Sequence, residues 1–123
     1  MVEKERMSSR TQPKMVARIW RGRVKSAQAD EYTDYLYRNG LRHMQGIDGN
    51  LGTQMLKKAE GEVTEFLVIS YWDIGKAQSA IKKITGGETG KSWLLEKDRE
   101  YLVDANTSVA HYDVLVDDWV RTR

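Results

Sequence analysis

Apolar residues recur at two spacings along residues 15–116 of this chain, one typical of strands and one typical of helices. Four runs rich in β-branched and aromatic residues predict strands at 15–24, 51–58, 63–72 and 107–116. Apolar residues at helical spacing separate the first run from the second, and the third from the fourth. Strand, helix and strand therefore follow one another twice, which predicts the split β-α-β arrangement called ferredoxin-like. We expect an α+β fold with a four-stranded antiparallel sheet and both helices on one face, because crossover connections are right-handed.

Each predicted helix has a polar start and one apolar stripe. The first should begin at Ser26, a preferred N-cap residue, and Gly40 should weaken or bend it. Its stripe consists of Ala29, Tyr32, Leu36 and His43. The second should begin after Asp73 and end at the glycine pair 86–87. Its stripe consists of Ile74, Ala77, Ile81 and Ile84. A short third helix is expected around residues 93–102.

The predicted sheet is apolar on both faces, although the helices can cover only one. The strand 63–72 directs Phe66, Val68 and Trp72 to one face and Leu67, Ile69 and Tyr71 to the other. The strand 15–24 likewise offers Val16 and Trp20 on one face and Ala17 and Ile19 on the other. Leaving three or four large side chains in water would forfeit roughly 1.5–3 kcal/mol each. We therefore predict a homodimer in which two copies pair their uncovered sheet faces.

Composition limits the domain count and the partners. A chain of 123 residues suffices for one domain, which we place at 15–117. Residues 1–14 are polar and aperiodic and predict a disordered tail, and 118–123 form a C-terminal tail. The first 14 residues hold four basic and two acidic residues, so 16 of each remain elsewhere. Since this balance gives no basic surface on the domain, we expect no nucleic-acid partner.

The chain has no cysteine, which excludes disulfides and cysteine metal sites and suits a reducing compartment. No apolar run reaches the ~18 residues of a membrane span, and the N-terminus lacks the apolar core of a signal peptide. We expect a cytoplasmic protein with no membrane partner.

Residues 85–92, TGGETGKS, are similar to a phosphate-binding P-loop. The motif needs glycine where Thr85 stands, and it should follow a buried strand rather than an amphipathic helix. This favours a glycine-rich loop, and we expect no nucleotide or other cofactor.

His43 and His111 are the two histidines. Neither has the spacing to other ligands that a metal site needs, so we expect no metal. His43 lies on the helical stripe, which favours a buried helix-end residue. His111 lies in the middle of a predicted strand. Either could accept a proton, because an imidazole pKa of roughly 6.5 suits proton transfer near neutrality.

Aromatic residues could form a site for a flat organic ligand; the candidates are Trp20, Trp72, Tyr35 and Tyr112, together with Tyr32 and Tyr71. The alternative is that they fill the core and the dimer interface. Arg18 has apolar neighbours, so a buried guanidinium there would need a partner. It could bind a substrate oxygen anion or pair with a carboxylate such as Glu65.

Four segments together resemble the antibiotic biosynthesis monooxygenase domain: MVARIWRGRV at 15–24, GIDGNLGTQMLKK at 46–58, EFLVISYWD at 65–73 and AHYDVLV at 110–116. The resemblance covers about 15–116 and implies two ferredoxin-like subunits paired as a dimeric α/β barrel. It also implies oxidation of polycyclic phenolic compounds by oxygen without metal or flavin, in which the protein supplies a dry pocket, deprotonation and anion stabilisation.

The match to the family's functional residues is partial. Trp72 matches the tryptophan that ends the third strand, whereas Val68 stands where quinone-forming members carry asparagine. Ile81 and Lys91 stand where the haem-degrading branch carries tryptophan and histidine, so the resemblance does not imply haem degradation.

Two functions remain open at this point. The first is a cofactor-independent monooxygenase acting on a phenolic or polycyclic aromatic molecule. His111 or His43 would accept the proton, Arg18 would stabilise the anion, and Trp72, Trp20, Tyr35 and Tyr112 would line the substrate pocket. The second is a non-catalytic homodimer of the same fold that binds a ligand or responds to stress.

Overall fold

The computed structural model describes residues 12–85, 98–103 and 108–119. The strands are β1 (Met15–Lys25), β2 (Asn50–Glu60), β3 (Val63–Asp73) and β4 (Ser108–Val114). The helices are η1 (Ser26–Gln28), α2 (Ala29–Leu36), the π-helical turn η2 (Tyr37–Leu41), α3 (Arg42–Gln45), α4 (Ala77–Thr85) and α5 (Asp98–Tyr101). All neighbouring strands are antiparallel, in the order β2-β3-β1-β4. This confirms the predicted ferredoxin-like sheet.

Several predictions lie wholly or partly outside the described residues. They are the disordered tail, of which residues 1–11 are not described, the end of the second helix at 86–87, the glycine-rich motif beyond residue 85, the first part of the short helix predicted at 93–102, the start of the last strand at 107, and residues 120–123 of the C-terminal tail.

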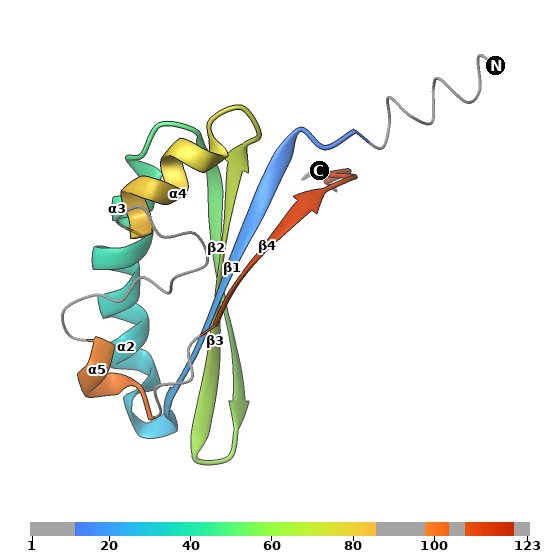
Figure 1. The fold of residues 1–123 in the computed structure, drawn as a ribbon. Coiled ribbons are helices and arrows are strands. Elements are labelled where there is room, and N and C mark those ends of the chain that lie inside the picture. The colour runs from blue at the N-terminus through green and yellow to red at the C-terminus, as the bar shows by residue number, and fades with distance from the viewer. Residues whose placement is uncertain (1–11, 86–97, 104–107, 120–123) are drawn as a thin grey trace.

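The described helices all lie against one side of the sheet (Figure 1). On β3 every second residue is buried on that side, and the buried set is Thr64, Phe66, Val68, Ser70 and Trp72. The alternate residues, including Leu67, Ile69 and Tyr71, are half-buried on the uncovered face. The predicted assignment of these side chains to two faces is therefore confirmed.

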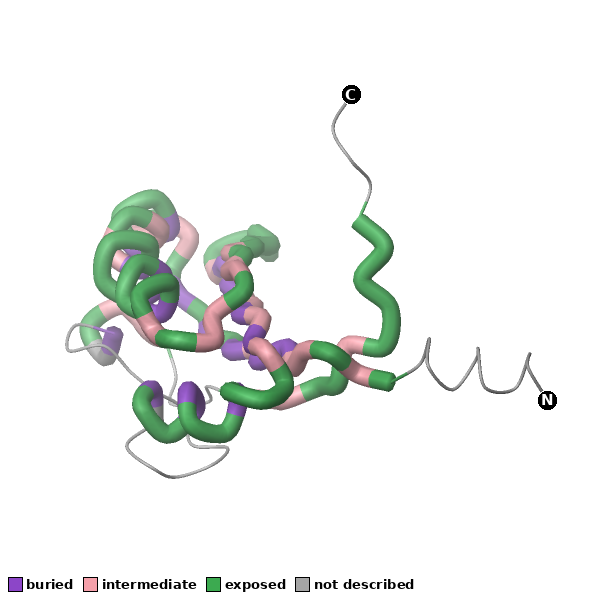
Figure 2. Tube along the Cα trace, turned by 90° about the horizontal axis from the view of Figure 1, so that it is seen from above, coloured by how far each residue is buried: buried purple, intermediate pink, exposed green. Residues whose placement is uncertain are grey.

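The core lies between the sheet and the helices, where the buried residues gather in Figure 2. Tyr32 of α2 meets Phe66 of β3 edge to face, with ring centroids 5.2 Å apart. Gly22 of β1 leaves space for the neighbouring indole, because a Cβ atom there would lie 2.5 Å from the Trp20 ring.

The first long helix departs from the predicted stripe at η2. Tyr32 and Leu36 are buried as expected, but the next buried residues are Gly40, Leu41 and Met44. A π-helical turn spans one residue more than an α-helical turn, so it rotates everything after it relative to the core. His43 is exposed as a result. The prediction that His43 is a buried residue at the end of the helix was wrong.

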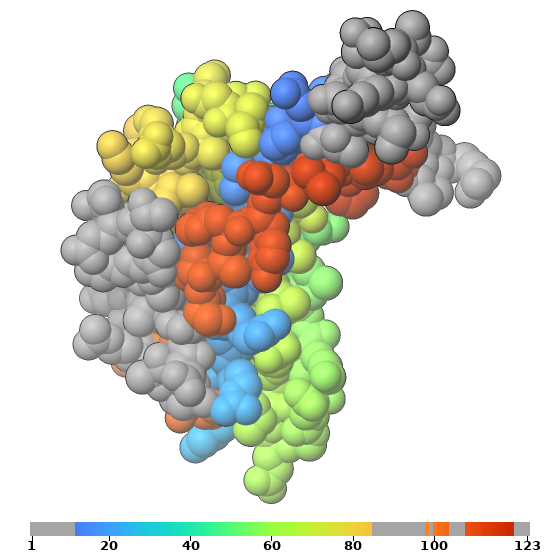
Figure 3. Space-filling model, turned by 45° about the vertical axis from the view of Figure 1, so that its right-hand side comes forward, coloured from blue at the N-terminus to red at the C-terminus, as the bar shows by residue number. Residues whose placement is uncertain are grey.

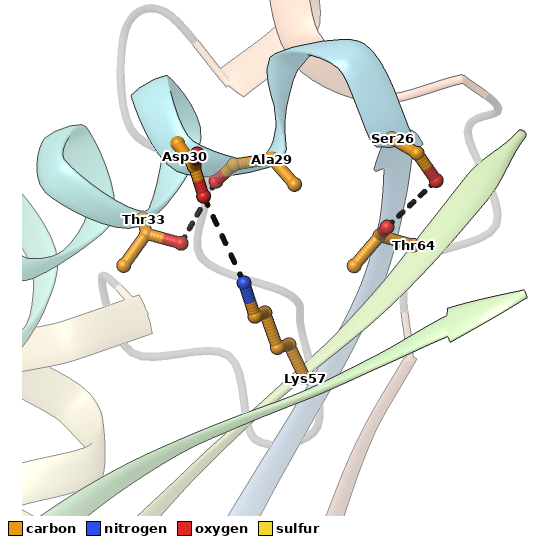
Figure 4. Close-up of polar contacts among 6 residues, drawn as sticks. All are labelled: Ser26, Ala29, Asp30, Thr33, Lys57 and Thr64. Carbon is orange, nitrogen blue, oxygen red and sulfur yellow. Dashed lines mark hydrogen bonds and ion pairs between the residues drawn. The ribbon is translucent and has the colours of Figure 1, made fainter.

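Ser26 begins the helical segment, but its side chain caps no helix. Its hydroxyl donates to the Gly61 carbonyl oxygen at 2.8 Å and lies 2.8 Å from the Thr64 hydroxyl (Figure 4). In the same view, Lys57 of β2 approaches Asp30 of α2, with Nζ 3.8 Å from Oδ1. Ser26 thus fastens the end of β1 to the β2–β3 hairpin, which corrects the predicted N-cap.

The second long helix begins later than predicted. The Asp73 carboxylate accepts a hydrogen bond from the Gly75 backbone at 3.1 Å, and α4 starts only at Ala77. Ile74 precedes the helix and is exposed, whereas Ala77, Ile81 and Ile84 are buried as the stripe predicts. Among the described helices, none combines the length and the apolar character needed to cross a membrane.

Candidate functional site

A buried arginine lies on the helix side of β1. Arg18 is 2% exposed, and its Nε and Nη2 atoms have no hydrogen-bond acceptor among the described residues. Burial lowers the pKa of Arg18 to about 10, so the guanidinium remains a cation at neutral pH. Glu65 is not its partner, because Glu65 points to the uncovered face and its Oε2 lies 3.5 Å from Nε of Arg21. That alternative was wrong.

A small cavity of about 20 Å³ lies against Arg18. Its other lining residues are Trp20, Leu36, Gly40, Met44, Val68 and Asp98. Most of these walls are apolar, and the backbone of η2 contributes Gly40. The volume is that of one water molecule.

Asp98 brings a carboxylate to the same cavity from α5. It is 2% exposed, and one carboxylate oxygen accepts a hydrogen bond from the Tyr32 hydroxyl at 3.0 Å. Burial, followed by the charge and the hydrogen bond of Asp98, raises the pKa of Tyr32. Tyr32 therefore stays protonated and donates. The segment is held at β1, where Leu102 bridges Val24.

His111 stands opposite Arg18 in the β1–β4 ladder. It is half-buried, and its Nε2 atom is buried without a hydrogen-bond partner in the described parts of the chain. Burial, and then the positive charge of Arg18, lower the pKa of His111 below its ordinary value. The imidazole is therefore neutral at neutral pH and able to accept a proton.

A second cavity, of about 370 Å³, opens beside His111 between β1, β4 and α4. Figure 3 shows this side of the molecule, with β4 in orange-red and α4 in gold. The remaining lining residues are Val16, Ile74, Ala77, Gln78, Ile81 and Asp113. The histidine thus faces a largely apolar space, with the Arg18 cation next to it on the neighbouring strand.

The predicted site residues fall into three groups. Arg18, His111 and Trp20 come together on the helix side of β1 and β4. Trp72 and Tyr35 lie in or against the core: the Trp72 indole donates to the Ser70 hydroxyl at 2.9 Å, and the Tyr35 ring packs on Tyr32 and Tyr101.

Tyr112 and His43 are apart from this group. Tyr112 is 58% exposed and pairs with Ala17 on the uncovered face of the sheet. His43 lies on the exposed side of α3 and lines neither of the two cavities described above.

Sequence reasoning missed Asp98, and it considered Tyr32 as a core residue or as part of an aromatic site but not as a hydrogen-bond donor. Asp98 lies in an aperiodic stretch 66 residues from its hydrogen-bond partner. No local pattern marks such a contact, since it arises only when α5 packs under β1.

The uncovered sheet face carries a groove of its own. It measures about 370 Å³ and is lined by Ala17, Ile19, Ile69, Tyr71, Val114, Val116 and residues 117–119. Trp119 packs edge to face on Tyr71 with ring centroids 5.9 Å apart, yet remains 61% exposed. The apolar character predicted for this face is present in the folded subunit.

Comparison with known proteins gives likeness of fold without likeness of sequence. No family model matches the chain, and no curated protein does. A candidate antibiotic biosynthesis monooxygenase from Bacillus cereus covers 89% of this chain and 99% of its own, with 15% identity and a TM-score of 0.61. A haem-degrading protein from Mycobacterium tuberculosis has two haems bound in its active site. It covers 83% of this chain and 97% of its own, with 18% identity and a TM-score of 0.56.

A third similar structure is a dimeric ferredoxin-like protein from an uncultured marine organism. It covers 86% of this chain and 99% of its own, with 14% identity and a TM-score of 0.55. At these identities the likeness shows the fold alone. The ferredoxin-like prediction is confirmed, and so is the resemblance to antibiotic biosynthesis monooxygenases at the level of the fold.

Proposed function

We propose that this chain, which shares the fold of antibiotic biosynthesis monooxygenases, binds a small phenolic aromatic molecule beside His111 and oxidises it with dioxygen. One observation carries the proposal. The Nε2 atom of His111 is buried without a partner in the described structure, in a residue that lines a 370 Å³ cavity and has the Arg18 cation beside it.

The cavity suits a compact aromatic ligand. Binding sites for small molecules usually measure about 300–1,000 Å³ and are mostly apolar, with a few polar groups. Val16, Ala77 and Ile81 supply apolar walls here, and His111 and Asp113 supply the polar groups. The hydrocarbon part of the ligand would contact α4, and its acidic group would point to His111.

The proposed reaction requires a base and a stabilised anion. His111 removes a proton from an activated CH₂ carbon of the substrate, and the charge of Arg18 stabilises the resulting anion. The anion forms a carbon–oxygen bond with dioxygen, and the histidine returns its proton to the peroxide oxygen. The hydroperoxide then loses water to leave a ketone. One oxygen atom enters the product and the other leaves as water, so no external reductant is consumed.

Oxygen uptake with a panel of anthrone-like phenols tests this proposal. Replacing His111 by alanine should lower the rate about 10²–10⁴-fold, the usual contribution of a general base. Arg42→Ala, an exposed change on α3, should leave the rate unchanged. His43→Ala tests the other histidine, and a loss confined to that variant would overturn the assignment of His111. Equal rates in wild type and His111→Ala would also overturn it.

A non-catalytic ligand-binding protein is the second candidate. Two observations favour it: neither cavity is lined by both Arg18 and His111, and Trp72 and Tyr35 pack with the core. In that case phenols would quench tryptophan fluorescence on binding, while oxygen uptake would stay at the rate without protein. In both cases we propose a homodimer formed through the uncovered sheet face.

A further inference from the structure

We propose that the small cavity beside Arg18 holds one water molecule that bridges Arg18 to Asp98, and that Asp98 and Tyr32 thereby position the Arg18 guanidinium. The evidence for the water is the size of the cavity and the polar groups that line it. Its consequence for ligand binding rests on the proposed function.

The donor side of the site is Arg18. Buried N–H groups in proteins are almost always hydrogen-bonded to protein or to ordered water. Arg18 is buried, yet Nε and Nη2 find no acceptor among the described residues, and Arg18 lines the cavity. These donors need an acceptor within the space that Arg18 borders.

The size of the cavity and its acceptor point to water. A cavity needs roughly 10–15 Å³ to accept one water, which then needs two to four polar partners. This cavity measures about 20 Å³ and offers Arg18 on one side and Asp98 on the other. A water there accepts from the guanidinium and donates to the carboxylate. A chloride or phosphate would meet the negative charge of Asp98, so a neutral molecule is favoured.

The carboxylate is itself held in place. The Tyr32 hydroxyl donates to Asp98 at 3.0 Å, and Tyr32 is completely buried. The backbone N–H of Val103 donates to the Arg23 carbonyl at 2.9 Å, which keeps α5 against β1. One hydrogen-bonded network would then run from α2 to β1, through Tyr32, Asp98, the water and Arg18.

This hydrogen-bonded network should have a measurable effect on the pKa of His111. Among the residues that the structure describes, the charged groups near His111 are Arg18 on β1 and Asp113 on β4, and α4 presents the uncharged Gln78 and Ile81 to the same cavity. Asp98 offsets part of the Arg18 charge. Removing the Asp98 charge should therefore strengthen the effect of Arg18 on the histidine.

Two measurements on the full-length protein test the proposal. A crystal structure should show one water within hydrogen-bond distance of both Arg18 and Asp98. In an NMR titration of the imidazole C–H signals, Asp98→Asn should lower the midpoint of His111 further. Asp34→Asn, a control on the exposed surface of α2, should not move it.

Tyr32→Phe keeps the Asp98 charge and the aromatic ring, so it covers the case in which Asp98→Asn fails to fold. It should preserve the water but loosen the carboxylate, seen as raised mobility of both groups in the crystal structure. A dry cavity in the wild-type crystal, or a His111 midpoint that is identical in wild type and Asp98→Asn, would overturn the proposal. If the water and the shift are present but no phenol is oxidised, the proposed function fails while this inference stands.

Discussion

Arg18 shows how a single residue can be marked by its sequence context while its surroundings remain unpredictable. The apolar neighbours of Arg18 in β1 indicated a buried cation, and it is buried. Glu65 was the wrong partner because odd-numbered residues of β3 point to the uncovered face. Asp98 could not be predicted as a neighbour of Arg18, because the two residues meet only when α5 packs against β1. Local pattern thus identified the unusual residue but not the groups that surround it.

Arg18 and Asp98 should be coupled energetically. Arg18→Met removes the cation from a cavity that Asp98 also lines, so the buried carboxylate loses a favourable charge interaction and the protein should lose stability. The double variant Arg18→Met/Asp98→Asn removes both charges and should recover about 0.5–3 kcal/mol of that loss. Urea unfolding of the four proteins measures the difference.

Arg21→Met is the matched control for this cycle. Arg21 is exposed on the uncovered face and pairs with Glu65, so its loss should cost no more than about 1 kcal/mol. Strictly additive effects of Arg18→Met and Asp98→Asn would show that the two charges do not interact.

His111 should make the protein sensitive to mild acid. Its pKa is lowered in the folded state, first by burial and then by the charge of Arg18. Below about pH 6.5 the unfolded chain binds this proton before the folded chain does, so stability falls as the pH falls through that region. Thermal unfolding between pH 7.5 and 5 should show this slope, and His111→Gln should reduce it. An unchanged slope would place the titrating group elsewhere. Phenol oxidation should slow once the folded protein takes up this proton, because a protonated His111 cannot remove the substrate proton.

At the scale of elements, the spacing of apolar residues along the sequence located every described strand and both long helices. It failed within the first helix, where the stripe Ala29, Tyr32, Leu36 was extended by seven residues to His43. The π-helical turn η2 lengthens that interval, so Met44 is buried instead. Gly40 was expected to bend the helix, and it lies in this turn and lines the cavity of Arg18.

A one-residue deletion should therefore be tolerated in η2 but not in α2. Removing Asn39, which is exposed, turns the π-helical turn into an α-helical one and keeps Leu36, Leu41 and Met44 on the buried side. We expect this variant to lose less than about 1 kcal/mol of stability. Removing Thr33 from α2 rotates Tyr32 relative to Leu36 and should cost at least about 2 kcal/mol. Urea unfolding compares the two, and equal losses would show that η2 contributes no surplus residue.

At the scale of the whole molecule, the order of the elements and the handedness of crossovers were enough to predict the sheet and its helix layer. The site was harder to predict, because a cavity depends on side chains that meet across β1, β4 and α4. Tyr112 illustrates the limit. It neighbours His111 in sequence, yet alternation along β4 places it on the opposite face, in the region expected to meet a second copy.

The uncovered face provides the final prediction, a dimer. Leu67, Ile69 and Tyr71 remain half-buried there, and Leu56, Tyr112 and Trp119 are exposed. Burying each large side chain yields roughly 1.5–3 kcal/mol, so a second copy would gain substantially by covering them. Size-exclusion chromatography with light scattering should give twice the chain mass at micromolar concentration. Leu67→Lys, at the centre of this face, should give a monomer. Tyr37→Lys, a change at an exposed position on η2, should remain dimeric. A wild-type monomer under these conditions would mean that the sheet face serves some other partner, and that the His111 cavity functions within one subunit.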